Sequence, residues 1–400
     1  MFKRFIRLWQ SFCKFILAEK KWCWPSQSDV LVLDATLPSM VLVEFLEPWS
    51  PKVLHMRGEQ FNIPVLLASF FKRGSLVNAY VDCYIEKVRP RLLVTFMDTY
   101  VGFYSISKRH PDVKTLFVQN AMRNYFTDIY EVFDDLGSEV TSNFFVDYMM
   151  VLGPDIGKKY SQYIAGEIVE MGSIKNNLVR KEKSSQQGVI ALVSQWRDCA
   201  GFQMKGDFCL FEDFWTKPDS LVVQCLMQYA KTKNKQLMII PNRLKNLPED
   251  LIRREEDYYR ELLGSEPEIL YPSGPYPAYQ AVDSAEIVVS LDSTLGLESI
   301  ARGGKAAIFP IRGPAIGDPS LNFGWPGDFP DEGLFWTNSP NPESFVRILD
   351  YLFAVDDEQW RKDVEASNFS SILAYDPGNS IFKETLEKIL GTPPSSKSVS

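Results

Sequence analysis

The chain has 400 residues, of which 45% are hydrophobic and 24% charged, and its net charge is −8 at pH 7. This length predicts two domains of roughly 180–200 residues each, and the acidic balance excludes broad nucleic-acid binding, which needs a basic surface. Six scattered cysteines without a CxxC pair, and only two histidines, exclude a disulfide framework, a zinc-finger pattern and a histidine-rich metal centre.

Residues 1–24 have a basic amphipathic pattern. Apolar side chains recur at helical spacing from Phe2 to Leu17, and the segment carries six basic side chains and one acidic one, so its net charge is +5 and the rest of the chain carries −13. Such a helix suits an anionic membrane surface; the alternative is a helix that packs on the first domain. No cleavage site of small residues follows, and no run of about 18 apolar residues that would span a bilayer occurs. We expect a cytoplasmic protein, peripheral on the inner membrane where this helix binds lipid.

Residues 25–179 are predicted to form a first Rossmann-like domain. Short, continuously apolar runs alternate with helical stretches, which is typical of a buried parallel sheet. The expected strands are 30–33, 52–55, 92–97, 115–118 and 148–152. The expected helices between them are 39–46, 75–88 and 100–108.

The polar stretch RKEKSSQQ, residues 180–187, is predicted to be a linker, after which the same alternation restarts. A second domain is expected over 188–372, followed by a C-terminal helix over 373–391 and a disordered tail over 392–400. Its expected strands are 189–193, 236–240, 287–290 and 306–309. Its expected helices are 221–231, 251–263, 276–284 and 295–302. Two doubly wound halves would form a cleft between the carboxyl ends of their strands, where ligands usually bind.

The turn at residues 292–294 is the most informative local feature. Asp292, Ser293 and Thr294 lie between a buried strand and a helix, where free backbone N–H groups and the helix dipole attract anions. Glu298 does not have capping-box spacing and lies one turn into the helix, where its carboxylate is placed to accept both hydroxyls of a ribose. The structural alternative is that Asp292 or Ser293 only caps the helix, while Glu298 pairs with Arg302 at i+4.

The segment SLDSTLGLESIARGGKAAIFP, residues 290–310, resembles the donor-binding segment of GT-B glycosyltransferases. It is similar to the STLGxE…G pattern of bacterial transferases that build capsule, O-antigen and other surface carbohydrates. The resemblance implies that Ser293, Thr294 and Gly296 meet the phosphates of a nucleotide-sugar donor and that Glu298 holds its ribose. Five earlier stretches resemble the same family: HMRGEQFNIP (55–64), RPRLLVTFMDTYVGFY (89–104), HPDVKTLFVQNAMRN (110–124), DYMMVLGPDIGKKY (147–160) and MGSIKNN (171–177).

This resemblance covers roughly residues 30–310 and implies a GT-B fold, with an acceptor domain followed by a donor domain. It implies transfer of a sugar from a nucleotide-sugar to a growing polysaccharide or a lipid-linked glycan. The His-Pro motif that sialic-acid and Kdo transferases often carry in the second domain has no counterpart here, because the matching stretch is IPNR at 240–243. A CMP-linked acidic sugar is therefore not supported as the donor.

Candidate catalytic groups follow the strands of the first half. An inverting transferase needs a base for the acceptor hydroxyl. Asp98, which follows the strand 92–97, is the first candidate, and its alternative role is to cap the next helix. Glu59 is the second candidate, and its alternative role is a salt bridge with Arg57. Asn120 and Arg123 are placed to hold acceptor or donor oxygens, or else only form a turn. Asp34, after the first strand, is expected to be a turn or cap residue.

In the second half, Arg197 and Arg243 follow the first two strands and are candidates for donor-phosphate binding, with a solvated surface charge as the alternative. Lys305 and Arg312 are weaker candidates. No Asp-x-Asp motif follows a strand, so we expect no metal and no cofactor, with arginine and helix-end amides stabilising the leaving group.

Three functions stay open at this stage. The first is a glycosyltransferase. The second is a nucleotide-sugar epimerase, which shares the fold and a similar donor turn but needs further acid and base groups around one sugar carbon. The third is a non-catalytic protein that keeps the fold and only binds, because a fold alone does not determine chemistry.

Overall fold

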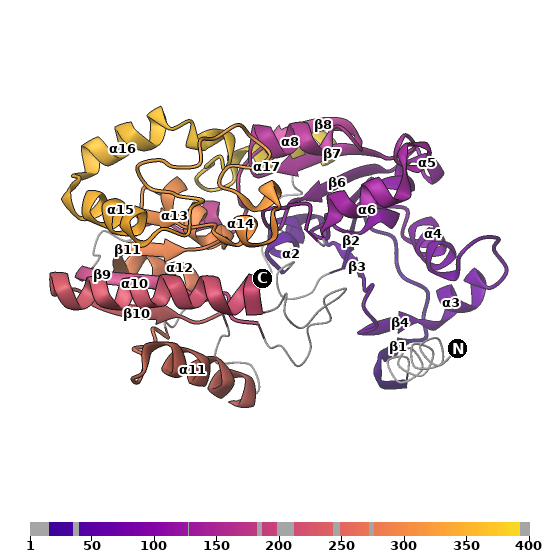
Figure 1. Ribbon diagram of the computed structural model, residues 1–400. Helices are drawn as coiled ribbons and strands as arrows, with labels where there is room; N and C mark the ends of the chain where they lie inside the picture. The colour runs from indigo at the N-terminus through magenta and orange to yellow at the C-terminus, as the bar shows by residue number, and fades with distance from the viewer. Residues whose placement is uncertain are drawn as a thin grey trace, which may run out of the picture.

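The computed structural model describes residues 16–34, 40–126, 128–181, 186–197, 212–242, 249–271 and 276–392. Two parallel sheets, one from each half of the chain, lie side by side with helices around them (Figure 1). The predicted α/β class is therefore confirmed. We call the two halves the N-terminal unit and the C-terminal unit.

The N-terminal unit contains a six-stranded parallel sheet with the order β3-β2-β5-β6-β7-β8. Its strands are β2 (Val30–Leu33), β3 (Lys52–Leu54), β5 (Leu92–Thr95), β6 (Lys114–Val118), β7 (Phe145–Val151) and β8 (Ala165–Glu170). A separate parallel pair consists of β1 (Glu19–Lys21) and β4 (Gln60–Asn62). The expected N-terminal helix is thus wrong at residues 19–21, which form a strand because β4 supplies a pairing partner; residues 1–15 lie outside the described part of the chain.

Alternation along each strand gives this sheet two apolar faces. Val30 and Val32 point to one face and Leu31 and Leu33 to the other. The first face is covered by α2 (Met40–Leu46) and α17 (Ser380–Leu390). The second face is covered by α4 (Leu76–Val88), α5 (Ile106–Arg109), α6 (Ile129–Leu136) and α8 (Pro154–Tyr160), and the short helices α3 (Ile63–Ser69) and α7 (Ser138–Thr141) complete the unit.

The C-terminal unit contains a four-stranded parallel sheet with the order β10-β9-β11-β12. Its strands are β9 (Gln186–Val193), β10 (Gln236–Ile240), β11 (Ala285–Ser290) and β12 (Ala306–Ile308). Its helices are α10 (Lys217–Lys233), α11 (Glu249–Leu263), α12 (Pro277–Ser284), α13 (Thr294–Ala301), α14 (Arg312–Ile316), α15 (Pro342–Ala354) and α16 (Asp357–Ala366). β9 begins inside the stretch predicted as a linker, and residues 182–185 of that stretch are not described.

The chain crosses between the units twice. It leaves the N-terminal unit after β8 and returns with α17, whose Phe382, Leu386 and Leu390 are buried against the strands of the first sheet. Asn177 Nδ2 donates to Asn379 Oδ1 at 2.9 Å, which joins the outgoing and the returning segments. Arg91 donates to the carbonyls of Leu390 and Ile389, each at 2.9 Å, at the end of α17. The returning helix therefore fixes where the second unit sits against the first.

Across the described residues, none of the helices has both the length and the apolar character that crossing a bilayer requires.

The returning helix generates a stability prediction. Phe382 is fully buried, so Phe382→Ala leaves a cavity under the first sheet and should lower the free energy of unfolding by about 3–5 kcal/mol. Lys388→Ala, on the exposed side of the same helix, should change it by less than about 0.5 kcal/mol. Urea unfolding followed by circular dichroism measures both, and equal midpoints for the two variants would contradict the role given to α17.

Candidate functional site

Each sheet has a point where its strand order reverses, and a crevice forms there because the two flanking loops diverge. In the N-terminal sheet this point lies between β2 and β5, and in the C-terminal sheet between β9 and β11. Asp34 and Asp98 follow the first pair of strands. Residues 194–197 and the turn at 292–294 follow the second pair.

The carboxyl ends of the two sheets face each other. Met122 N–H, in the loop after β6, donates to Thr294 Oγ1 at 3.2 Å, and Tyr125 N–H donates to Ser320 Oγ at 2.9 Å. A small cavity of about 70 Å³ lies at this contact and has Arg123 on one wall and Ser293 on the other. The turn after β11 therefore faces the N-terminal unit.

The turn itself is built around Ser290 and Ser293. Ser293 is the N-cap of α13, and its Oγ accepts from Leu295 N–H at 3.3 Å, while Ser293 N–H donates to Ser290 Oγ at 3.1 Å. A Cβ on Gly296 would lie 2.6 Å from Ser290 Cβ, so only glycine lets α13 approach β11 this closely. Gly296 thus has a packing role between α13 and β11.

A buried guanidinium holds the turn in place. Arg312 is fully buried after β12, and its Nη1 donates to Gln195 Oε1 at 2.6 Å and also to Asp292 Oδ1. Its Nη2 donates to Asp219 Oδ1 on α10, and its Nε donates to Phe214 O at 3.2 Å. Burial raises the pKa of Asp219, and the charge of Arg312 opposes this shift. Asp292 therefore helps to orient the turn through Arg312.

A cavity of about 440 Å³ lies at the carboxyl end of β9, and we call it the tryptophan cavity. It is lined by residues that include Trp196, Arg197, Trp215, Asp219, Arg254 and Tyr258. Arg197 is exposed, and its guanidinium carbon lies 5.8 Å from the centre of the Trp215 ring. Aromatic rings stack on planar or apolar ligand surfaces, and arginine binds phosphate. The cavity therefore suits a ligand that has a planar or apolar part and a phosphate group.

Glu298 lies elsewhere than expected. Its side chain is 6% exposed and accepts hydrogen bonds from the Ser173 and Tyr279 hydroxyls. Burial raises its pKa, and those hydrogen bonds and the nearby charges of Arg302 and Lys175 oppose the shift. The carboxylate is thus enclosed in the junction between the units, and the expectation that it faces the cleft and is free to bind ribose is corrected.

Arg302 belongs to the same junction. Its guanidinium donates to Asn176 Oδ1 of the outgoing segment and to Asp283 Oδ1 of α12. The i+4 spacing had suggested an ion pair between Arg302 and Glu298. Arg302 instead forms its ion pair with Asp283. These contacts join the units by polar groups from both sides.

Asp98 is also corrected as a candidate base. It is fully buried, and its carboxylate accepts from Arg123 Nε at 2.7 Å, from Arg123 Nη2 and from Tyr160 OH at 2.8 Å. An acceptor hydroxyl does not reach a carboxylate enclosed in this way. Asp98 instead positions Arg123, whose side chain is 14% exposed at the contact between the units.

The other candidates lie at the edge of the N-terminal sheet or outside the described residues. Glu59 is exposed, and its Oε2 accepts from Arg57 N–H at 3.1 Å. Arg57 Nε donates to buried Asp34 at 2.8 Å, so Asp34 positions Arg57. Asn120 is exposed after β6. Arg243 lies outside the described residues.

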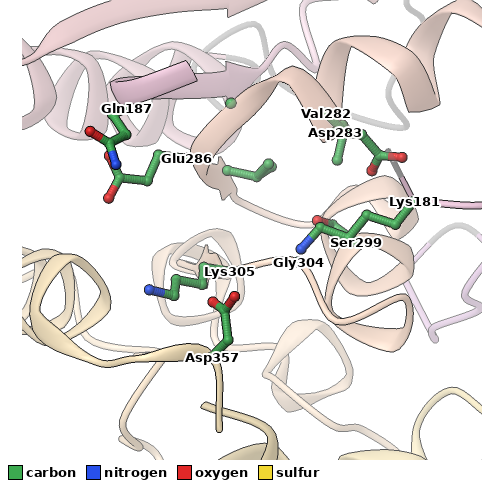
Figure 2. Close-up of a pocket in the computed structure, with 11 residues that line it drawn as sticks. Lys181, Gln187, Val282, Asp283, Glu286, Ser299, Gly304, Lys305 and Asp357 are labelled. Carbon is green, nitrogen blue, oxygen red and sulfur yellow. The ribbon is translucent and has the colours of Figure 1, made fainter. Parts of the chain in front are cut away.

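A separate polar cavity of about 480 Å³ lies at the opposite end of the C-terminal sheet (Figure 2). Glu286 at the start of β11 and Lys305 before β12 line it, together with Lys181 and Asp357. Because ligands of open parallel sheets bind at the carboxyl ends of strands, and this cavity lies at their amino ends, we place the candidate site at the tryptophan cavity instead.

Comparison with known proteins agrees with this architecture. Residues 116–390 match a protein family described as "putative O-antigen biosynthesis protein". Since this match spans more than half of the chain, the chain belongs to that family, and the predicted resemblance to surface-carbohydrate biosynthesis proteins is confirmed. No curated protein matches the sequence.

Solved structures share the fold at low sequence identity. The UDP-GlcNAc 2-epimerase from Neisseria meningitidis, bound to UDP-GlcNAc, is 12% identical with a TM-score of 0.53, and the match covers 90% of this chain and 99% of that one. A glycosyltransferase from Rickettsia africae is 12% identical with a TM-score of 0.50, covering 92% and 99%. The sucrose-phosphate synthase from Thermosynechococcus elongatus is 11% identical with a TM-score of 0.50, covering 90% and 98%. This likeness confirms the predicted GT-B fold.

The sequence interpretation missed Trp215 and Asp219 because it began the helix at residue 221. Pro218 is a start signal, since proline is favoured in the first turn of a helix, and α10 begins at Lys217. A helix predicted to begin at this proline would have had Asp219 in its first turn and Trp215 just before it. Both residues would then have been expected at the same end of the sheet as Arg197.

The Arg312 network generates a second prediction. Lysine carries the charge but not the planar set of donors, so Arg312→Lys should leave Asp219 or Asp292 without a partner. We expect the free energy of unfolding to fall by about 2–4 kcal/mol. The matched substitution Arg347→Lys, at an exposed pair with Glu332, should change it by less than about 0.5 kcal/mol. Thermal unfolding compares the two, and a wild-type melting temperature for Arg312→Lys would show that the network does not support the turn.

Proposed function

We propose that this member of the O-antigen biosynthesis family is a glycosyltransferase that moves a sugar from a nucleotide-sugar donor to a growing surface polysaccharide or a lipid-linked glycan. The observation that carries the proposal is the tryptophan cavity. It lies at the carboxyl end of β9, against α10 and α11, and Asp219 in its wall pairs with Arg312, which also holds the turn that contacts the N-terminal unit. Family membership and fold agree with this function.

The donor side of the proposal uses the C-terminal unit. Trp215, which is partly exposed, would contact the nucleoside part of the donor, and Arg197 would bind its phosphates. The amino end of α13, with Ser293 and Thr294, would add helix-dipole and hydroxyl stabilisation as negative charge develops on the leaving phosphate. Arg243 stays a further candidate for the same phosphates.

The acceptor side uses the edge of the N-terminal unit. Because Asp98 is enclosed, Glu59 is the candidate base: it is exposed and lies in the loop between β3 and β4. In an inverting reaction it would take the proton of the acceptor hydroxyl while that oxygen bonds to the anomeric carbon. The bond from this carbon to the phosphate oxygen breaks, and the electron pair leaves with the nucleotide. Arg57, Asn120 and Arg123 would orient acceptor or phosphate oxygens.

We propose that the reaction takes place at the cytoplasmic face of the inner membrane, and that residues 1–24, whose net charge is +5, contribute to binding its anionic surface. We also propose that the chemistry requires no metal and no cofactor, with arginine and helix-end amides stabilising the leaving group.

Donor binding is the first test. Thermal shift with UDP-, GDP-, CMP- and dTDP-linked sugars should identify one stabilising nucleotide, and Arg197→Ala should weaken its affinity roughly 10–100-fold through loss of a charged hydrogen bond. Arg347→Ala, on α15, serves as the control and should bind as wild type does. Stabilisation by no donor, or equal affinities in both variants, would argue against a donor site at the tryptophan cavity.

Turnover is the second test, because binding alone does not separate the three functions. Glu59→Gln should lower kcat roughly 10²–10⁴-fold and leave the donor affinity unchanged, since glutamine does not accept the proton. Glu19→Gln, a nearby exposed carboxylate, should keep wild-type turnover. The assay follows nucleotide release with membrane-derived glycan acceptors. Conversion of the donor sugar without any acceptor would identify an epimerase instead, and unchanged turnover in Glu59→Gln would remove Glu59 as the base.

A further inference from the structure

The hairpin of α3 and α4 exposes apolar side chains at its tip. Five large hydrophobic residues between 67 and 77 are strongly exposed: Leu67 57%, Phe70 62%, Phe71 91%, Leu76 44% and Val77 53%. Figure 1 shows this hairpin on the N-terminal unit, at the side away from the C-terminal unit. A cluster of this kind on a protein surface marks an interaction site.

The tip is exposed although the hairpin is well formed. Asn62 caps α3, its Oδ1 accepting from Val65 N–H at 3.2 Å, and Ser75 caps α4, its Oγ accepting from Asn78 N–H at 3.2 Å. The inward face of α4 buries Tyr80, Val81 and other residues in the core of the unit. The exposure of Phe70 and Phe71 is therefore a property of the folded hairpin and not of a frayed end.

Cations adjoin the apolar tip. Lys72 and Arg73 directly follow Phe71, and Arg73 is exposed. Lys72 Nζ lies 2.5 Å from Glu86 Oε1 on α4, so one acidic group offsets part of this charge. On a chain with a net charge of −8, an apolar tip with adjacent cations is complementary to an anionic lipid surface, where the rings enter the interface and the cations meet the headgroups.

The β1–β4 pair links this tip to the N-terminal segment. Lys21 of β1 pairs with Asn62 of β4, the residue that caps α3, and Asn62 Nδ2 donates to Cys23 O at 2.8 Å. The chain that follows residues 1–15 is thereby fixed to the base of the hairpin.

We infer that the α3–α4 tip is a membrane-docking element that inserts Phe70 and Phe71 into the interface of an anionic bilayer. The shape of the surface favours lipid over a protein partner, because a convex tip between two helices offers a small contact area, whereas a stable protein interface needs roughly 800 Å² from each partner.

Vesicle flotation with the full-length protein tests this inference. The vesicles are phosphatidylcholine with or without about 30% phosphatidylglycerol. The double variant Phe70→Ser/Phe71→Ser should lower the partition coefficient about tenfold or more on the anionic vesicles, because two rings no longer leave water. Lys72→Gln/Arg73→Gln should lower it on the anionic vesicles and leave the weak binding to neutral vesicles unchanged.

Matched controls lie on the C-terminal unit. Met227→Ser/Leu334→Ser removes two exposed apolar side chains, 38% and 44% exposed, and Arg361→Gln/Lys362→Gln removes two exposed cations. Both should partition as wild type does, and the melting temperatures of all four variants should match wild type because the sites are exposed.

Wild-type partitioning of the Phe70/Phe71 variant, or an equal loss in the controls, would overturn the inference. So would light scattering that shows a dimer dissociated by the same variant, since a second copy of the chain would then cover the tip. The assay contains no nucleotide-sugar, so its outcome is independent of whether the protein transfers a glycosyl group.

Discussion

The buried guanidinium of Arg312 is the constraint on which the candidate site depends. A charge removed from water is tolerated only with close partners. Here the partners come from the loops after β9 and β11, from α10 and from the segment before α10. Satisfying Arg312 therefore fixes four separate segments at the carboxyl edge of one sheet. The position of the turn at 292–294 and the wall of the tryptophan cavity follow from the same set of hydrogen bonds, because Asp219 belongs to both.

The contact between the two units changes from a buried polar network to an open, solvent-exposed region. Around Glu298 and Arg302 the contact is buried and polar, with donors and acceptors from both sides. At the turn it consists of single hydrogen bonds, such as Met122 to Thr294. Beside Arg197 the C-terminal unit is open. A buried polar network gives specific relative placement, since each group must find its partner, so the deep junction sets the angle between the units while the open part stays accessible to a ligand.

The sequence predicted the central strands well because a strand covered on both faces is a continuous apolar run, as in residues 30–33 and 92–95. It missed β8, whose sequence AGEIVE is largely exposed at the sheet edge, and it missed β1 and β4, whose short polar sequences form strands only because each pairs with the other. Long-range pairing of this kind leaves no local periodicity to detect.

The same reasoning explains which site residues were predictable. The turn at 292–294 was found because a strand followed by a capped helix is a local signal. The true environments of Asp98 and Glu298 were not, because Arg123 and Tyr160 approach Asp98 from positions 25 and 62 residues away, and Ser173 approaches Glu298 from the other unit. A carboxylate at a strand end looks the same in sequence whether it is solvated or enclosed.

Under the proposed function, the contrast between the two units suits two different substrates. The C-terminal unit presents a ligand edge fixed by buried ion pairs, which suits a small donor of constant structure, since preorganised groups lose little entropy on binding. The N-terminal unit presents Glu59, Arg57 and Asn120, all exposed, at an edge without comparable enclosure. An open edge suits a long glycan of which only the terminal hydroxyl must be placed. Because the exposed α3–α4 tip belongs to this same unit, the proposed attachment to a bilayer would hold the N-terminal unit, rather than the tryptophan cavity, at the membrane.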